Sequence, residues 1–296
     1  LVQGLILVNK PKGITSFAAV ARVRRLAGIK RVGHTGTLDP LAEGVLPILI
    51  GRATALCSYI TETEKSYTAR VRLGITTDTE DITGNVLTEK AVHVTDAQLL
   101  AAAESFLGEC EQIPPMFSAI KVDGKRLYSL ARKGEEIERT PRKIFIKSIT
   151  VRDFDGKEFY LDVTCGKGTY IRSLCRDIGE KLGCGATLTE LIRTQTAVFS
   201  IENCVPLDDL TEENINTFIL PTDKAVESMP QLNVTEKQAV RFSNGGMLDV
   251  TRTGLKNATD DMLLRVKYNG VLLGIGRVEE GSIKVACVLN NKDGSD

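Results

Sequence analysis

Short turns, rather than helices, connect most of the strand-like segments of this chain, and this pattern most constrains its fold. Residues 67–73 alternate apolar and polar side chains, which indicates a half-buried strand. Residues 143–152 and 158–164 are two further strand candidates, joined at Asp155 and Gly156 as a hairpin. Because strands and helices do not alternate regularly, the sequence predicts an α+β fold rather than a doubly wound one.

Helices are predicted where a capping residue precedes an apolar periodicity. Ser16 is expected to cap a helix that runs to about residue 27, and Thr95 opens a capping-box pattern for a second helix. Residues 169–182 carry an apolar stripe with helical spacing. A further short helix is predicted at residues 188–193.

The charge of the chain is zero in total but uneven along its length, with 38 basic and 38 acidic residues. Residues 1–60 carry eight basic and two acidic side chains, and residues 117–172 carry thirteen and eight. The segments between and after them, 61–116 and 173–230, each carry four basic and ten acidic side chains. This excludes a uniformly basic nucleic-acid coat. If the two basic blocks fold side by side, they form one basic face that could bind a polyanion. The alternative is that the uneven charge is due to chance and only reflects surfaces exposed to solvent.

Cysteine and histidine usage argues against a metal or disulfide framework. The seven cysteines include no Cys-x-x-Cys pair, and the chain has only two histidines. Reduced thiols in a cytoplasmic protein are therefore expected, with no metal. No apolar run approaches the roughly 20 residues of a membrane helix, so no membrane association is expected.

The length of 296 residues suits one large domain followed by a small one. We expect a first domain over residues 1–230, which includes an acidic, proline-punctuated linker at about 206–230. A small β-rich domain is expected over residues 231–290, and residues 291–296 are expected to fray.

Residues 29–47 hold five glycines or prolines, which predicts a loop, and this loop contains His34 and Asp39. Glycines allow a backbone to approach a ligand closely. Asp39 is therefore a candidate catalytic carboxylate, although a turn in which it bonds its own backbone is the alternative. His34 alone is compatible with an ordinary turn or core histidine.

Residues 166–172 lead from a strand into a helix and place Arg172 in the first helical turn. A cation at this position opposes the helix dipole, which indicates a nearby anion. That anion could be a carboxylate such as Asp39, or a phosphate. Tyr67 lies on the apolar face of its strand, where a buried core tyrosine is the simpler interpretation.

Several spaced motifs resemble the bacterial tRNA pseudouridine synthase B family over nearly the whole chain. Residues 33–47 match the family loop G-H-x-G-x-L-D-P-x-A-x-G-x-L-P in full. Residues 10–16 match its opening motif, residues 65–67 its tyrosine strand and residues 166–172 its arginine motif. Further matches are found at residues 77–84, 113–119 and 128–134.

This resemblance implies a role for each matching residue. Asp39 corresponds to the catalytic aspartate, and Arg172 to the arginine that pairs with it. Tyr67 corresponds to the tyrosine that stacks on the target uracil and is implicated in proton removal. His34 corresponds to the histidine near the flipped-out nucleotide, and Leu191 to an apolar contact under the site.

The resemblance also implies a fold. The expected fold has a mixed, mostly antiparallel central sheet flanked by helices and loops, plus a small C-terminal PUA-like RNA-binding domain. The candidate contacts to substrate RNA are Lys10, Lys121, Arg132 and Arg193; for Lys121 and Arg132, which lie in the second basic block, an ordinary solvated surface charge is the alternative. Where the family often has histidine and arginine, this chain has Thr187 and Ile192, which leaves local tRNA contacts there in doubt.

The implied activity is isomerisation of uridine 55 in the T loop of tRNA, by base flipping and without a cofactor. The expected partner is the T-arm stem-loop, with no obligatory protein partner. A non-catalytic RNA-binding or RNA-folding module is the alternative from another class, and RNA folding is also a possible additional role. A guide-RNA-dependent synthase is a third interpretation, which the compact length without an extended basic tail argues against.

Overall fold

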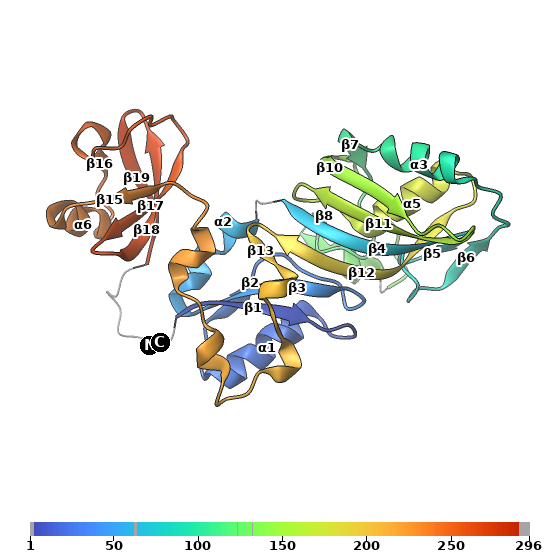
Figure 1. The fold of residues 1–296 in the computed structure, drawn as a ribbon, viewed down its shortest axis with the longest axis horizontal. Coiled ribbons are helices and arrows are strands. Elements are labelled where there is room, and N and C mark those ends of the chain that lie inside the picture. The colour runs from blue at the N-terminus through green and yellow to red at the C-terminus, as the bar shows by residue number, and fades with distance from the viewer. Residues whose placement is uncertain (1–2, 62–63, 123, 132, 290–296) are drawn as a thin grey trace. The chain divides into compact units, whose positions relative to one another are not determined.

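The computed structural model of this chain describes residues 3–61, 64–122, 124–131 and 133–289 (Figure 1). Contacts within the chain divide it into two compact units. The first unit consists of residues 1–39, 46–61 and 202–296, and the second unit consists of residues 40–45 and 62–201. The chain therefore passes from the first unit to the second directly after Asp39.

An antiparallel sheet forms the centre of the second unit, with its strands in the order β12, β4, β11, β10 and β7. The bounds of these strands are Ala186–Thr196 (β12), Lys65–Leu73 (β4), Glu158–Cys165 (β11), Arg142–Arg152 (β10) and Gly108–Gln112 (β7). From Tyr67 onward, β4 alternates buried and half-buried residues, as its sequence predicts. The β10–β11 hairpin is also confirmed: the two strands pair antiparallel, and in the turn the Asp155 carboxylate accepts hydrogen bonds from the Lys157 and Glu158 N–H groups.

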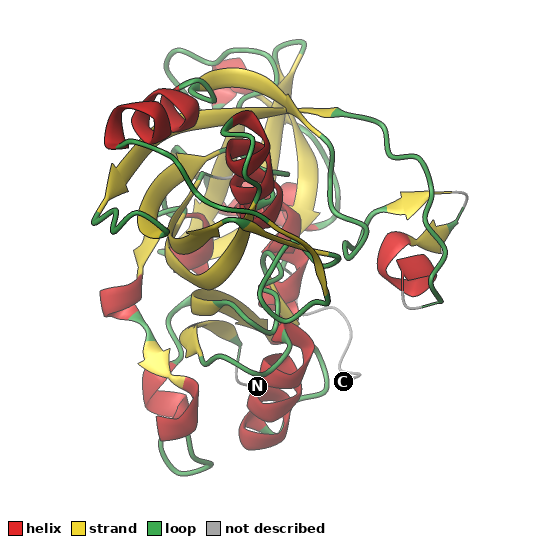
Figure 2. Cartoon of the chain, turned by 90° about the vertical axis from the view of Figure 1, so that its right-hand side faces the viewer, coloured by secondary structure: helices red, strands yellow, loops and turns green. Residues whose placement is uncertain are grey.

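Two helices pack against this sheet and against one another (Figure 2). Helix α5 (Ile171–Lys181) contacts β12 and β4, and helix α3 (Asp96–Glu104) contacts β10. The predicted apolar stripe of α5 is buried, with Leu174 and Ile178 fully inaccessible. The other elements of this unit are β5 (Ile75–Thr77), β6 (Val86–Glu89), β8 (Lys121–Val122), β9 (Lys125–Arg126), α4 (Leu127–Ala131) and β13 (Phe199–Ser200).

The first unit contains the N-terminal strands and the chain from residue 202 onward. Its N-terminal elements are β1 (Gly4–Lys10), α1 (Ser16–Ala27), β2 (Val32–His34), β3 (Glu43–Ile50), η1 (Gly51–Leu56) and α2 (Cys57–Thr61). Strand β2 pairs antiparallel with β3 through residues 48–50, and the first three residues of β3 belong to the second unit. The parallel pairs, such as β1 with β14, make the strand pairing mixed, as the resemblance implies.

The acidic segment at residues 206–230 is folded rather than extended. It contains short elements: β14 (Val205–Pro206), η3 (Leu207–Asp209), η4 (Ile215–Phe218) and η5 (Thr222–Val226), after η2 (Ile201–Asn203). Leu207 and Ile215 are buried, and the backbone of Leu220 bonds that of Leu5 in both directions. The segment thus contributes to the core of the first unit, while the domain boundary at residue 230 stays a prediction.

The C-terminal residues form a second sheet with its own apolar core, which confirms the predicted β-rich tail. Its strands follow the order β15, β17, β18, β19 and β16. Their bounds are Gln231–Asn233 (β15), Leu263–Tyr268 (β17), Val271–Glu279 (β18), Ser282–Val288 (β19) and Leu248–Asp249 (β16), with α6 (Glu236–Ser243) and η6 (Val250–Arg252). Phe242 of α6 is fully buried in this core beside Leu264 and Val266. Among the described residues, no helix is long and apolar enough to cross a membrane.

Three local predictions need correction. The helix predicted at residues 188–193 is wrong, because this segment lies inside strand β12, where pairing with β4 overrides the helical spacing. The loop predicted over residues 29–47 is interrupted by β2 and ends at β3, so that only residues 29–31 and 35–42 lie outside regular elements. Helix α1 is capped by Thr15, whose hydroxyl accepts from the Ala18 N–H, whereas Ser16 bonds elsewhere.

Candidate active site

Asp39 is half-buried in the loop that connects β2 to β3. A backbone hydrogen bond joins the two ends of this hairpin loop, because the N–H of Thr35 donates to the Pro47 carbonyl at 3.1 Å. His34 ends β2 and pairs with Ile48 of β3, and its carbonyl accepts a hydrogen bond from Cys57 Sγ at 3.1 Å. The hairpin thus fixes the two ends between which the aspartate is presented.

Gly44 brings the end of this loop against strand β12 within the second unit. Its register partner is Arg193, in a parallel pair, and its φ of 104° lies in the region that favours glycine. A Cβ atom at this position would lie 2.2 Å from the Arg193 carbonyl oxygen, so a larger residue would push the strands apart. Arg193 is fully buried and its Nε donates to the Val45 carbonyl at 2.8 Å. In this structure it holds the start of β3 to β12, a different role from the RNA contact expected for it.

A single row across adjacent strands links this loop to the tyrosine. Gly44 of β3 pairs with Arg193 of β12, which pairs with Tyr67 of β4. The Tyr67 residue is 8% exposed. Leu191 is also buried and pairs with Ala69, two residues along β4 from Tyr67, so both side chains lie on the same face of the sheet. Tyr67 and Leu191 are therefore neighbours in register on one face of this sheet, while their roles stay predictions.

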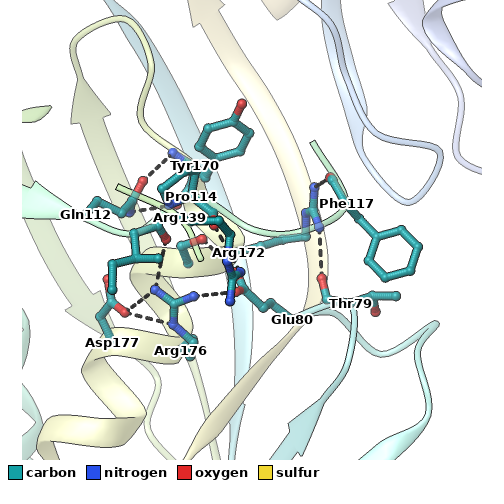
Figure 3. A network of polar contacts seen from close by, with 12 residues as sticks. Thr79, Glu80, Gln112, Pro114, Phe117, Arg139, Tyr170, Arg172, Arg176 and Asp177 are labelled. Atoms are coloured by element: carbon teal, nitrogen blue, oxygen red, sulfur yellow. Dashed lines mark hydrogen bonds and ion pairs between the residues drawn. The ribbon is translucent and has the colours of Figure 1, made fainter. Parts of the chain in front are cut away.

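Arg172 lies in the first turn of α5 and is 4% exposed. Its guanidinium joins two distant segments (Figure 3): Nη1 donates to the Thr79 carbonyl and Nη2 to the Phe117 carbonyl, each at 2.8 Å. Its Nε is 4.0 Å from Asp81 Oδ2. A planar, permanently charged group suits several partners in fixed directions at once, which explains an arginine in this helical turn.

Asp81 is a site residue that the sequence analysis did not assign. It is buried, and its Oδ1 accepts hydrogen bonds from Thr79 Oγ1 at 2.9 Å and from the Thr83 N–H at 3.0 Å. These bonds fix the carboxylate whose second oxygen faces Arg172. The sequence feature that could have identified Asp81 is the Thr-x-Thr-x-Asp-x-x-Gly motif at residues 77–84. This motif was part of the family resemblance, but no role was assigned to its aspartate.

Glu80 forms a second tie between the same turn and α5, and it too was missed. Its carboxylate accepts a hydrogen bond from Ser173 Oγ at 2.6 Å and pairs with the Arg176 guanidinium. Arg176 also donates to the Ile113 carbonyl at 3.1 Å. Glu80 adopts a φ of 64°, an uncommon value for a non-glycine residue, which these contacts hold in place.

The cysteines near these elements are poorly suited to nucleophilic chemistry. Burial raises the pKa of Cys165 to about 11, and it raises the pKa of Cys175 further. Both groups are therefore neutral thiols near pH 7, and the thiolate is the reactive form.

A cavity of about 790 Å³ in the second unit lies beside this network. Its described lining includes Phe117 and Arg176 but not Tyr67 or Arg172. Its acidic lining residues are Asp78, Glu80, Glu111, Glu135, Glu136, Asp177 and Glu180, and burial raises the pKa of the Asp177 carboxyl. Because carboxylates outnumber the two lining arginines, this cavity is a poor phosphate site.

The remaining predicted RNA contacts have different positions. Lys10 is fully buried, and its ammonium donates to the carbonyls of Pro11 at 2.7 Å and Ile14 at 2.9 Å, so it closes a turn of its own chain. Lys121 begins β8, and Arg132 lies outside the described residues.

The departure at Thr187 has a structural explanation. Thr187 is fully buried, and its hydroxyl forms a hydrogen bond with Thr77 Oγ1 at 3.1 Å. Thr187 therefore supports the turn that carries Asp81. Because its side chain is buried, it is not accessible to RNA. The second departure, Ile192, is half-buried and pairs with Thr68 of β4.

Comparison with family models gives two matches, to consecutive segments that together span residues 24–227. The N-terminal domain model of TruB family pseudouridylate synthases matches residues 24–171. The model described as the tRNA pseudouridylate synthase B C-terminal domain matches residues 172–227. Together they include Asp39, Tyr67, Arg172 and the whole sheet of the second unit.

Named relatives agree with the family models over nearly their full lengths. The tRNA pseudouridine synthase B of Clostridium perfringens strain ATCC 13124 is 45% identical over 291 residues, which cover 97% of this chain and 99% of that protein. The protein of the same name from Pseudomonas fluorescens strain Pf0-1 is 42% identical over 289 residues, which cover 94% of this chain and 92% of that protein.

A solved structure shows the same fold. A chain in a crystal structure of a Cbf5–Nop10–Gar1 complex superimposes with a TM-score of 0.77 at 26% identity, covering 97% of this chain and 85% of that chain. Family models, full-length relatives and fold give one consistent assignment. This chain belongs to the TruB family of pseudouridylate synthases.

Proposed function

We propose that this protein converts uridine 55 in the T loop of tRNA to pseudouridine, acting alone and without a guide RNA. The proposal is supported by relatives named tRNA pseudouridine synthase B that match this chain over nearly its full length. Substrate and product are isomers, so the reaction needs no electron donor and no transferred group. The residues of this chain can therefore carry the chemistry themselves.

The observation that carries the proposal is the row from Gly44 through Arg193 to Tyr67. Neighbouring strands lie about 4.8 Å apart, so the backbones of Gly44 and Tyr67 are about 10 Å apart. Asp39 precedes Gly44 by five residues, and five extended residues span at most about 17 Å. The carboxylate of Asp39 can thus reach a base that is held against the Tyr67 ring.

In the proposed reaction, the Asp39 carboxylate assists cleavage of the N1–C1′ glycosidic bond. The detached uracil turns within the site, and its C5 atom bonds to C1′. The proton on C5 is then removed and N1 carries a proton, so that the product has the atoms and electrons of the substrate. Tyr67 is the group that we assign to proton removal.

Tyr67 and Leu191 would bind the extruded uridine. Flipping a base out of a folded loop costs a few kcal/mol, and stacking on an aromatic ring returns about 1–3 kcal/mol. Buried Leu191 would exclude water beneath the uracil, which keeps the detached base from being lost. His34 would occupy the space that the uridine leaves.

Arg172 would pair with Asp39 and set the direction of its carboxylate. A guanidinium carries five N–H donors. Arg172 can therefore donate to the carbonyls of Thr79 and Phe117 and still pair with the Asp39 carboxylate. The segments around residues 79 and 117 would thereby be linked to the catalytic carboxylate through one buried cation.

The rest of the chain would hold the tRNA. We assign catalysis to residues 1–230 and an RNA contact to the PUA-like residues 231–290, which have a separate sheet and core. The basic blocks at 1–60 and 117–172 would contact phosphates of the T arm. The cytoplasm, where tRNA acts, is the expected location.

Mapping of pseudouridine at single-nucleotide resolution tests this function. An unmodified tRNA transcript is incubated with the purified protein alone, and a transcript with cytidine at position 55 serves as the control. We expect modification of uridine 55 and no other position, and none in the control. Unchanged uridine 55 would refute the proposed activity, and modification elsewhere would refute the proposed substrate.

A further inference from the structure

Ser16 makes an unusual long-range contact with the catalytic loop. It is the first residue of α1 and is 2% exposed. Its hydroxyl donates to the Leu38 carbonyl at 2.9 Å and accepts from the Leu38 N–H at 2.8 Å. One side chain thus satisfies both backbone groups of a residue 22 positions away.

This contact is not explained by helix capping, because the neighbouring Thr15 performs that task. The Thr15 hydroxyl accepts from the Ala18 N–H at 3.0 Å. The turn before it is closed separately by the Lys10 ammonium. The two adjacent hydroxyls therefore have different functions, and that of Ser16 is directed at the loop.

Leu38 directly precedes Asp39, and this gives the contact its consequence. The carbonyl of Leu38 and the N and Cα atoms of Asp39 belong to one planar peptide unit. A hydrogen bond that fixes this carbonyl therefore fixes the Cα of Asp39, from which the carboxylate projects. Leu38 is 3% exposed, so water cannot easily replace the hydroxyl.

We propose that Ser16 is a positioning residue that sets the Asp39 carboxylate through the Leu38 backbone. This inference rests on the proposed catalytic role of Asp39. Ser16 itself does not need to touch the RNA. Its loss would misplace the reacting group rather than remove an RNA contact, and a displacement of about 1 Å can cost about 100-fold in rate.

The test compares Ser16→Ala with Thr15→Ala, which removes the neighbouring hydroxyl from the same helix end but spares the Leu38 contact. For Ser16→Ala we expect the single-turnover rate at saturating tRNA to fall about 100-fold, with the dissociation constant of tRNA changed less than about threefold. Thr15→Ala should keep the wild-type rate. Rates are measured below the unfolding temperature of each variant.

Ser16→Cys keeps the inference testable if the alanine variant does not fold. A thiol is a weaker donor and acceptor, so an intermediate rate is expected. A wild-type rate in Ser16→Ala or Ser16→Cys, or an equal loss in Thr15→Ala, would overturn the positioning role. A loss of rate in Ser16→Ala accompanied by full activity of Asp39→Asn would instead refute the proposed function of Asp39.

Discussion

Asp39→Asn is expected to lower the single-turnover rate of pseudouridine formation at least about 10³-fold. The amide has almost the shape of the carboxylate but carries no charge and is a poor nucleophile. Binding of tRNA should persist, because it depends on phosphate contacts elsewhere in the chain. Rates are measured by quantifying pseudouridine at position 55, and affinity is measured by filter binding.

Glu43→Gln is the matched control for this variant. Glu43 follows Asp39 by four residues, is half-buried, and its backbone pairs with Ile192. The substitution removes the same charge at the start of β3, directly after the loop, so a general electrostatic effect on RNA binding is reproduced. We expect its rate to stay within about threefold of wild type. An Asp39→Asn variant that kept more than a tenth of the rate would remove Asp39 from its role.

Arg172→Met is expected to lower the free energy of unfolding by about 3–5 kcal/mol, since removing one partner of a buried ion pair leaves the other uncompensated. The Thr79 and Phe117 carbonyls would lose their donors, and Asp81 would face no guanidinium. Catalysis should be lost as well, even at temperatures where the variant is folded. Urea denaturation and single-turnover kinetics measure the two effects.

Arg152→Met is the control for Arg172→Met, because it also removes an arginine that is bonded to carboxylates, but at an exposed position. Arg152 is bonded to Asp162 at 2.7 Å, but its side chain is 43% exposed, so its loss should cost about 1 kcal/mol or less. Adding Asp81→Asn to Arg172→Met should recover part of the lost stability, because it removes the uncompensated charge. Equal stability of the two methionine variants would contradict the buried role of Arg172.

Local sequence patterns predicted the elements that local interactions determine. The capping box at Thr95, the alternation along β4 and the hairpin at Asp155 all follow from residues close together in the chain, and the structure has each of them. The family resemblance, rather than a local pattern, assigned Tyr67 and Leu191 to one site; the structure has them on one face of the sheet, and their roles stay predictions.

The errors fall where distant segments decide the outcome. Residues 188–193 have helical spacing, but pairing with β4 makes them a strand. Nothing near Ser16 in sequence shows that its hydroxyl bonds Leu38, 22 residues away. The contacts of Asp81 with Arg172 join segments about 90 residues apart and needed the folded chain to be seen.

The central claim is that one carboxylate, Asp39, acts on a uracil held by Tyr67 beside Arg172. A crystal structure of this protein with a T-arm RNA tests it most directly, through the distances from the Asp39 carboxylate to the Arg172 guanidinium and to the extruded base. The account predicts an ion-pair distance of about 4 Å or less, with the uracil stacked on the Tyr67 ring. A bound uracil with Asp39 remote from both Arg172 and the base would contradict it.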